Sequence, residues 1–151
     1  MAIARGAGTE IIRTHLFEDV IGVGSRDLII GVQHHIYTVL SIIVYTNGLD
    51  STADYSNLKL VGYDSYGGTT AQGILLNSRT LNEKETFVWN DKFSFNGCEP
   101  TNFTGPLSTV AEQDLIADQA ESGIPQKLQV YVSHASAQLD IVVTFIDQNN
   151  A

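Results

Sequence analysis

The sequence of 151 residues contains a single cysteine, Cys98. This excludes an intramolecular disulfide and any metal site built from a cluster of cysteines. Cys98 lies in Asn96-Gly97-Cys98-Glu99-Pro100, beside a carboxylate and a turn signal. That setting is poor for a reactive thiolate, which needs a neighbouring histidine or positive charge. We therefore expect an ordinary structural cysteine in a loop.

Positive charge is also scarce, with eight Lys and Arg against seventeen Asp and Glu, for a net charge of −9 at pH 7. The basic residues are scattered along the chain. A protein that binds nucleic acid needs a basic stripe that displaces counterions from phosphates. We therefore expect no direct binding to DNA or RNA.

Long apolar runs are missing as well. The longest, Ile36–Tyr45, has about half of the roughly 20 residues that a membrane-spanning helix needs. The N-terminal residues MAIARGAGTE do not form an apolar core behind a basic start, as a secretory signal would. We expect a soluble protein that is made in a cytoplasm, with no membrane partner and with residues 1–8 as a flexible arm.

Strand patterns dominate what is present, and the clearest is the C-terminal stretch Leu128–Gln148. Apolar and polar residues alternate in its first run, which is typical of a half-buried strand. In its second run, Leu139, Ile141, Val143 and Phe145 point one way, and Val142, Thr144 and Ile146 point the other. The pattern predicts a β-hairpin across Ser133–Ala137, with its second strand inside a sheet.

The rest of the chain repeats this pattern. The run Ile36–Tyr45 is apolar on both faces, which predicts a strand buried on both sides. The predicted strands cover residues 10–17, 28–32, 36–45, 58–64, 69–76, 86–95, 128–133 and 139–146. The sequence therefore predicts one all-β domain over residues 1–151, an antiparallel β-sandwich of about eight strands, with the jelly roll among its possible topologies.

Residues 96–126 differ in composition from the strand-rich segments around them and are predicted to be an insertion. They contain all three prolines, several acidic residues and no Lys or Arg before Lys127. Thr109 and Glu112 have the spacing of a capping box, which predicts one short helix within the insertion.

Candidate chemical sites are weak. His34 and His35 are adjacent, so on a strand they point to opposite faces and cannot hold one metal ion together. A metal site would need His15 or His134 brought close by the fold. Asn102-Phe103-Thr104 matches a glycosylation pattern, but the sequence shows no secretory signal. Ser133-His134 lacks the Gly-x-Ser-x-Gly turn of a hydrolase, and Gly22-x-Gly24 lacks the third glycine of a dinucleotide-binding loop. We expect no catalytic residue, no cofactor and no metal.

The order of segments resembles a small β-sandwich module of tailed-bacteriophage virion proteins. The segments that carry this resemblance are IYTVLSIIVYTNG, LKLVGYDSYGGTTAQGILL, LNEKETFVWNDKFSF and LQVYVSHASAQLDIVVTFID, within residues 28–95 and 127–147. The closing strands of such modules read L-x-V-x-x-S-A-x-x-x-L-D-V-x-V-S-Y, which is similar to Leu128–Phe145. The insertion at 96–126 departs from the simpler modules, which have only a few residues there.

The resemblance implies a non-enzymatic capsid decoration (cement) protein on the virion surface, with the major capsid protein as its partner. Two alternatives are a tail or head-tail adaptor subunit, and a carbohydrate-binding β-sandwich that would use Trp89, Tyr63 and Tyr66. A two-layer sandwich buries only one face of each sheet, so strands apolar on both faces also predict a homo-oligomer. The virion resemblance suggests a trimer.

Overall fold

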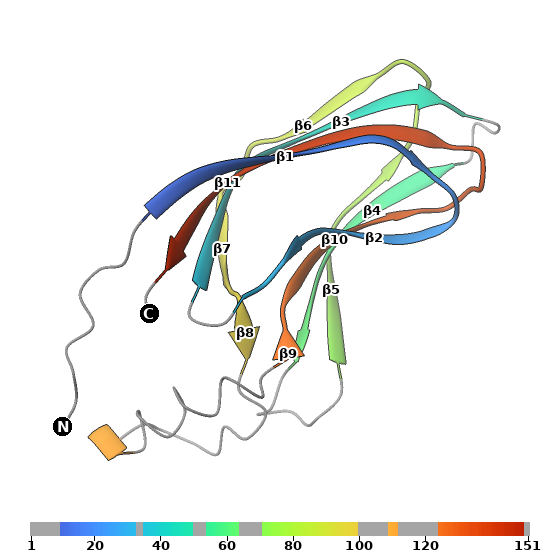
Figure 1. Cartoon of the computed structure of the whole chain (residues 1–151). Helices are drawn as coiled ribbons and strands as arrows, with labels where there is room; N and C mark the ends of the chain where they lie inside the picture. Colours follow the sequence, from blue (N-terminus) through green and yellow to red (C-terminus); the bar gives the residue numbers. More distant parts are fainter. Residues whose placement is uncertain are drawn as a thin grey trace.

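The computed structural model describes residues 10–32, 35–49, 54–63, 71–99, 109–111 and 124–149. Two antiparallel sheets pack face to face (Figure 1). Sheet A contains β1 (Glu10–Ile21), β3 (His35–Gly48), β6 (Thr86–Trp89), β7 (Phe93–Asn96) and β11 (Gln138–Asn149). Sheet B contains β2 (Gly24–Ile30), β4 (Tyr55–Tyr63), β5 (Ala71–Thr80) and β10 (Lys127–Val132). A third, small sheet pairs β8 (Cys98–Glu99) with β9 (Ile124–Pro125).

The strand order is that of a jelly roll. Sheet A runs β1-β11-β3-β6, with β7 also paired to β3, and sheet B runs β2-β10-β4-β5. Strands β6 and β7 can be counted as one interrupted strand. Successive strands of the sandwich then lie in opposite sheets, except for β4 and β5, which form a hairpin within sheet B. This confirms the predicted antiparallel sandwich and selects the jelly roll among its possible topologies.

The predicted C-terminal hairpin is wrong. Strand β10 pairs with β2 and β4, whereas β11 pairs with β1 and β3 in the other sheet. The linker Ser133–Ala137 therefore crosses between the sheets, and the Ser133 N–H donates to the carbonyl of Tyr55 at 3.1 Å. Both arrangements bury the same alternate residues, so the sequence pattern does not distinguish them. The prediction that the second strand lies inside a sheet is confirmed.

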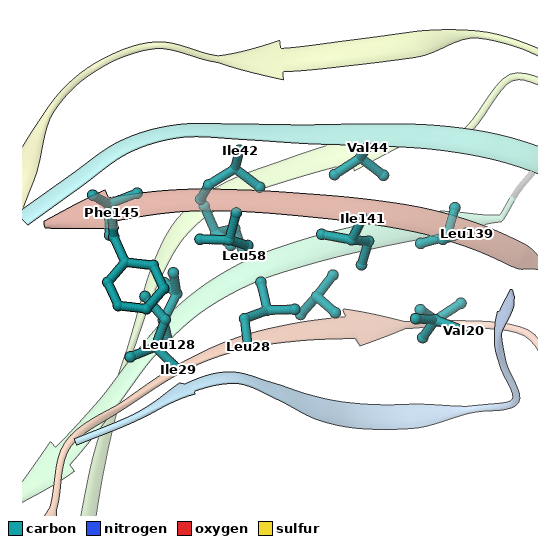
Figure 2. Close-up of a cluster of buried hydrophobic side chains, with 14 of the residues drawn as sticks. Val20, Leu28, Ile29, Ile42, Val44, Leu58, Leu128, Leu139, Ile141 and Phe145 are labelled. Atoms are coloured by element: carbon teal, nitrogen blue, oxygen red, sulfur yellow. The ribbon is translucent and has the colours of Figure 1, made fainter. Parts of the chain in front are cut away.

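The core lies between the two sheets and is built from alternate residues of their strands. Figure 2 shows Ile42, Ile141 and Phe145 of sheet A pointing toward Leu28, Leu58 and Leu128 of sheet B. Phe145 is 1% exposed, and Leu128, Leu139 and Val143 are 0% exposed. The four inward positions predicted for β11 are therefore confirmed.

The predicted burial of Ile36–Tyr45 on both sides is wrong. Along β3, Tyr37, Val39, Ile42 and Val44 are buried, while the residues between them are only partly buried or exposed. A bulge places Leu40 outside the regular register, because Phe145 pairs with Val39 and Thr144 pairs with Ser41. The extra residue moves Tyr37 and Ile42 onto the same face, where strict alternation had separated them.

One end of the sandwich is closed by backbone contacts. Gly31 N–H donates to the carbonyl of Gln126 at 2.8 Å, and Gln126 N–H donates to the carbonyl of Gly97 at 3.0 Å. Gly97 N–H donates to the carbonyl of His35 at 2.8 Å. These bonds connect the segment after β2, the start of β3 and both ends of the predicted insertion.

The insertion leaves and returns at neighbouring points, since Cys98 pairs with Pro125 and Glu99 pairs with Ile124. Of residues 100–123 the structure describes only 109–111. Val110 and Ala111 are helical, at the start of the predicted helix. The rest of that helix, the arm at residues 1–8 and the Asn102-Phe103-Thr104 pattern lie outside the described residues. Within the described ranges, no helix has the length and apolar character needed to cross a membrane.

Candidate interaction surface

The outer face of sheet A is rich in apolar and hydroxyl side chains. Directly paired residues lie on the same side of a sheet, so the register identifies three ladders that cross the strands. The first ladder is Leu16–Val142–Ile43–Val88, the second is Thr14–Thr144–Ser41, and the third is Ile12–Ile146–Thr38–Ser94. We call these three ladders together the apolar face. It includes no Lys, Arg, Asp or Glu.

Several side chains of the apolar face are in water. Leu16 is 74% exposed, Ile12 is 69% exposed and Val88 is 45% exposed. Charged residues border the ladders. Glu10 and Glu18 flank them along β1, Asp140 follows them along β11, and the exposed Asp91 and Lys92 lie between β6 and β7. The three ladders span five residues of β1, from Ile12 to Leu16, and are up to four strands wide. With strands about 4.8 Å apart and a rise of about 3.3 Å per residue, they cover on the order of 300 Å².

The outer face of sheet B mixes polar, charged and apolar side chains. Among the apolar ones, Ile30 and Leu75 are paired with Lys127 and Lys59 and are 54% and 52% exposed. Lys127, Gln129 and Tyr131 are the residues of this face on β10, and they alternate with the buried Leu128, Val130 and Val132. Asp27 accepts a 2.6 Å hydrogen bond from Gln129 Nε2, and its Oδ2 lies 3.6 Å from Lys127 Nζ. The ammonium of Lys59 lies 5.0 Å from the centre of the Tyr131 ring. We call this surface the polar face.

An ion-pair cluster joins β1, β3 and β11 of sheet A. It lies at the end of the sheet where β1 begins and β11 ends. Arg13 Nε donates to Asp147 Oδ2 at 3.0 Å, and His35 Nδ1 lies 2.5 Å from Asp147 Oδ1. Asp147 is only 7% exposed, and these two contacts give each oxygen of its carboxylate a partner. Sequence reasoning missed this site. Asp147 continues the inward row of β11, which is the signal that could have identified it.

Tyr37 lies beside this cluster and packs against Phe95 and Phe145, with ring centres 5.3 Å and 5.8 Å away. Its hydroxyl accepts a hydrogen bond from Val32 N–H at 3.1 Å. Burial raises the pKa of Tyr37 above its ordinary value of 10.0, and the nearby carboxylate of Asp147 adds to the rise, whereas the bond from Val32 opposes it.

The structure separates the histidines that sequence analysis considered. His35 contacts Asp147, and His34 lies outside the described residues. His15 Nδ1 lies 3.0 Å from the carbonyl of Leu28, and its ring packs edge-on against Phe145. His134 lies in the linker before the first residue of β11, whereas His35 pairs with Asn149, the last residue of β11. The full length of β11 therefore separates the two histidines. Among the described residues, no three His, Cys, Asp or Glu side chains gather as metal ligands would.

The other candidate residues have structural surroundings or lie outside the description. The backbone of Cys98 belongs to β8, but its side chain is not among the described ones. Gly22 adopts a positive φ of 103° in the turn between β1 and β2. Trp89 packs against the core, and its Nε1 donates to the carbonyl of Asp91 at 2.8 Å. A cavity of about 20 Å³ lies between the sheets beside Trp89, which is room for about one water molecule.

No known protein-family model matches this chain, and no curated protein matches it either. Solved structures with a similar architecture include the following three. One is from the work "Bacillus endospore appendages form a novel family of disulfide-linked pili", with 10% identity, a TM-score of 0.46, and coverage of 100% of this chain and 97% of that chain. The other two are infectious bursal disease virus chains, from the Gx strain and from the T13 viral particle.

Both viral chains are 8% identical to this chain, with TM-scores of 0.46 and 0.39, and the matches cover 95% and 96% of this chain. They cover 33% and 36% of the viral chains, so this chain spans about a third of their length. At these identities and TM-scores, the similarities describe a distant likeness of architecture and carry no information about function.

Proposed function

We propose that this protein is a non-enzymatic structural subunit of a phage particle, and that it decorates the assembled head. The observation that carries this proposal is the apolar face. A folded monomer leaves Ile12, Leu16 and Val88 largely in water, although the sandwich core is already filled by the inward rows. A contiguous exposed apolar patch on one side of a molecule often marks a site for another protein.

Decoration would follow from simple mass action. A protein that binds only the assembled shell, and not its free subunits, adds its binding free energy to the stability of the shell. The apolar face supplies the driving force for such assembly, about 25 cal/mol for each Å² of apolar surface removed from water. The partner in this proposal is the major capsid protein, and the protein is located on the virion surface.

The two alternative functions require different surface features of the protein. A carbohydrate-binding module needs exposed aromatic rings on which a sugar can stack. Trp89 instead packs against the core and donates its ring N–H to Asp91, while the Tyr63 side chain and Tyr66 lie outside the described residues. A tail or head-tail adaptor subunit could use the same apolar face, so the location in the particle distinguishes it from a decoration protein.

The test is to purify particles of the phage that encodes this chain and to separate heads from tails. Quantitative mass spectrometry should find the protein in heads, in many copies per particle. Leu16→Lys, which places a charge on the apolar face, should reduce its incorporation, while the matched change Gln129→Lys on the polar face should not. Recovery with tails would support the adaptor alternative, and absence from particles would refute both virion functions.

A further inference from the structure

We propose that β1 is a strap that opens from β11 as one unit while the rest of the sandwich stays folded, and that its closure completes the apolar face. The inference rests on the proposed function, because it names a regulation of the same assembly surface. Strand β1 supplies one residue to each ladder, namely Ile12, Thr14 and Leu16. An opened β1 removes all three from the face, so only the closed form presents the whole surface to a partner.

Strand β1 contributes little to the core. Val20 is the only buried side chain among those described in the strand, and eight of the others are exposed. Ile11 and Arg13 lie in its inward row, yet their exposed fractions are 46% and 49%. Opening β1 therefore removes few of its own side chains from apolar surroundings, with His15, Phe17 and Val20 as the main losses.

The contacts that hold the strap closed lie along an exposed edge. Strand β1 pairs with β11 and with no other described strand. Arg13 Nε contacts Asp147 Oδ2 at 3.0 Å toward one end, and the Asp19 N–H donates to Asp140 Oδ1 at 2.9 Å toward the other. Water can replace such bonds at an edge, so opening the strap needs less free energy than unfolding the whole chain.

The turn after β1 has the features of a hinge. A register shift between Phe17 and Val20 interrupts the pairing with β11, and Asp19, within this gap, has a φ of 51°. Gly22 and Gly24 follow, with φ values of 103° and 127°. Glycines absorb changes in φ and ψ at little steric cost. Among the described strands, β1 is joined along the chain only to β2, through this turn, so it can leave β11 without moving the others.

Binding at the apolar face should hold the strap closed. A partner that contacts Ile12 and Leu16, which are 69% and 74% exposed, binds the closed form and not the opened one. Such a partner lowers the opened population by the factor 1 + [partner]/Kd. Opening and assembly therefore oppose each other.

Hydrogen exchange of the purified full chain, followed by NMR, tests the strap itself. We expect the β1 amides that donate to β11 to exchange together, at least about 10-fold faster than the amides that join β3 to β11. The amides of β11 should then divide into two groups: those that donate to β1 exchange with it, and those that donate to β3 stay protected. Equal protection of the two groups, or exchange of β1 only together with β3, would overturn the proposal.

Two variants sharpen this measurement. Arg13→Gln removes the charge that contacts Asp147 and should speed the exchange of β1 by up to about 5-fold, whereas Lys127→Gln, in sheet B, should leave it unchanged. If both variants exchange alike in β1, the contact between Arg13 and Asp147 does not hold the strap closed.

A disulfide provides the opposite test. Thr14 and Thr144 face each other with their hydroxyl oxygens 3.4 Å apart, so cysteines at both positions can form a disulfide, in a chain that also carries Cys98→Ser. The oxidised form should lose the fast exchange of β1, and the reduced form of the same variant is the control. Equally fast exchange in the two forms would contradict an opening of β1 as one unit.

Exchange read by mass spectrometry on purified phage heads tests the coupling to assembly. Saturating binding should slow the exchange of β1 by at least about 10-fold and should leave β5, the edge strand of sheet B, unchanged. Slowing of β5 without β1, or of neither strand, would refute the coupling. A chain that is absent from heads would refute the proposed function and the coupling with it, while exchange of the free chain would still decide whether β1 opens.

Discussion

The two sheets have similar inner faces and different outer faces. Both inner faces are rows of Leu, Ile, Val and Phe that form one core. On the outside, sheet B presents charged and polar residues together with the exposed Ile30 and Leu75. Sheet A presents Ile12, Leu16, Val142 and Ile146 without a charge among its ladders. Folding needs only the inner rows, because a two-layer sandwich buries one face of each sheet. The apolar outer face of sheet A therefore exceeds what the fold requires.

The largest expected effect separates the inner rows from the outer rows. Phe145→Ala removes a ring that is 1% exposed and should lower the free energy of unfolding by about 3–5 kcal/mol. Leu16→Ala, on the outer row of the neighbouring strand, should cost less than about 1 kcal/mol under conditions in which the chain is monomeric. Urea unfolding of both variants measures the difference. Equal losses would mean that Leu16 belongs to the core as much as Phe145 does.

A second change acts where the two sheets are joined. A methyl group on Gly97 would lie 2.2 Å from the carbonyl oxygen of Val32 and 3.0 Å from that of His35, both backbone atoms. Gly97→Ala should therefore destabilise the fold by about 1–3 kcal/mol, through overpacking. In Gly73→Ala, the nearest atom would be Val61 Cγ2 at 3.8 Å, an ordinary contact, so this control should be nearly neutral. Thermal melting would contradict the backbone arrangement if both variants behaved alike.

The third prediction concerns the strand that carries Ile12 and Leu16. Asp147→Asn removes the negative charge that Arg13 and His35 share. Because Arg13 is half exposed, the expected loss is about 1–2 kcal/mol, less than for a fully buried ion pair. Asp91→Asn, in the turn between β6 and β7, makes the same change of charge and should have little effect. If urea unfolding finds no difference between them, the cluster does not hold β1 in place.

The smallest expected effect is a loss of folding stability at alkaline pH. Burial raises the pKa of Tyr37, so the folded chain keeps this proton at pH values where the unfolded chain loses it. Stability should therefore be complete below the unfolded value of about 10 and should fall as pH rises through the folded pKa. Unfolding measured from pH 9 to 11 should show a shallower fall in Tyr37→Phe than in the native chain. Parallel curves would contradict this role of Tyr37.

The sequence predicted which residues of a strand point inward better than it predicted which strands pair. Alternation fixed the inward row of β11, from Leu139 to Phe145, because a strand turns successive side chains to opposite faces. It could not show that Ser133–Ala137 crosses between sheets, since a hairpin and a crossing linker bury the same residues. The bulge at Leu40 was hidden for a similar reason, because an inserted residue changes the phase of the pattern without changing its composition.

For the candidate sites, too, the sequence indicated which strand faces are apolar but not which distant residues meet. An excess of apolar residues on β3 and β11 was visible in the sequence and led to the expectation of a covered second face. The partners of Asp147 were not visible, because Arg13 is 134 residues away and meets it only through the pairing of β1 with β11. Pairings of this length depend on the whole topology rather than on local spacing.

The central claim is that the outer face of sheet A, and not that of sheet B, is the assembly surface. Hydroxyl-radical footprinting, read by mass spectrometry for the free chain and for the chain on phage heads, tests it directly. The account predicts that Leu16, Ile12 and Ile146 are protected on heads, while Tyr131 and Tyr55 react equally in both states. Protection of the two tyrosines with no change at Leu16 would contradict it.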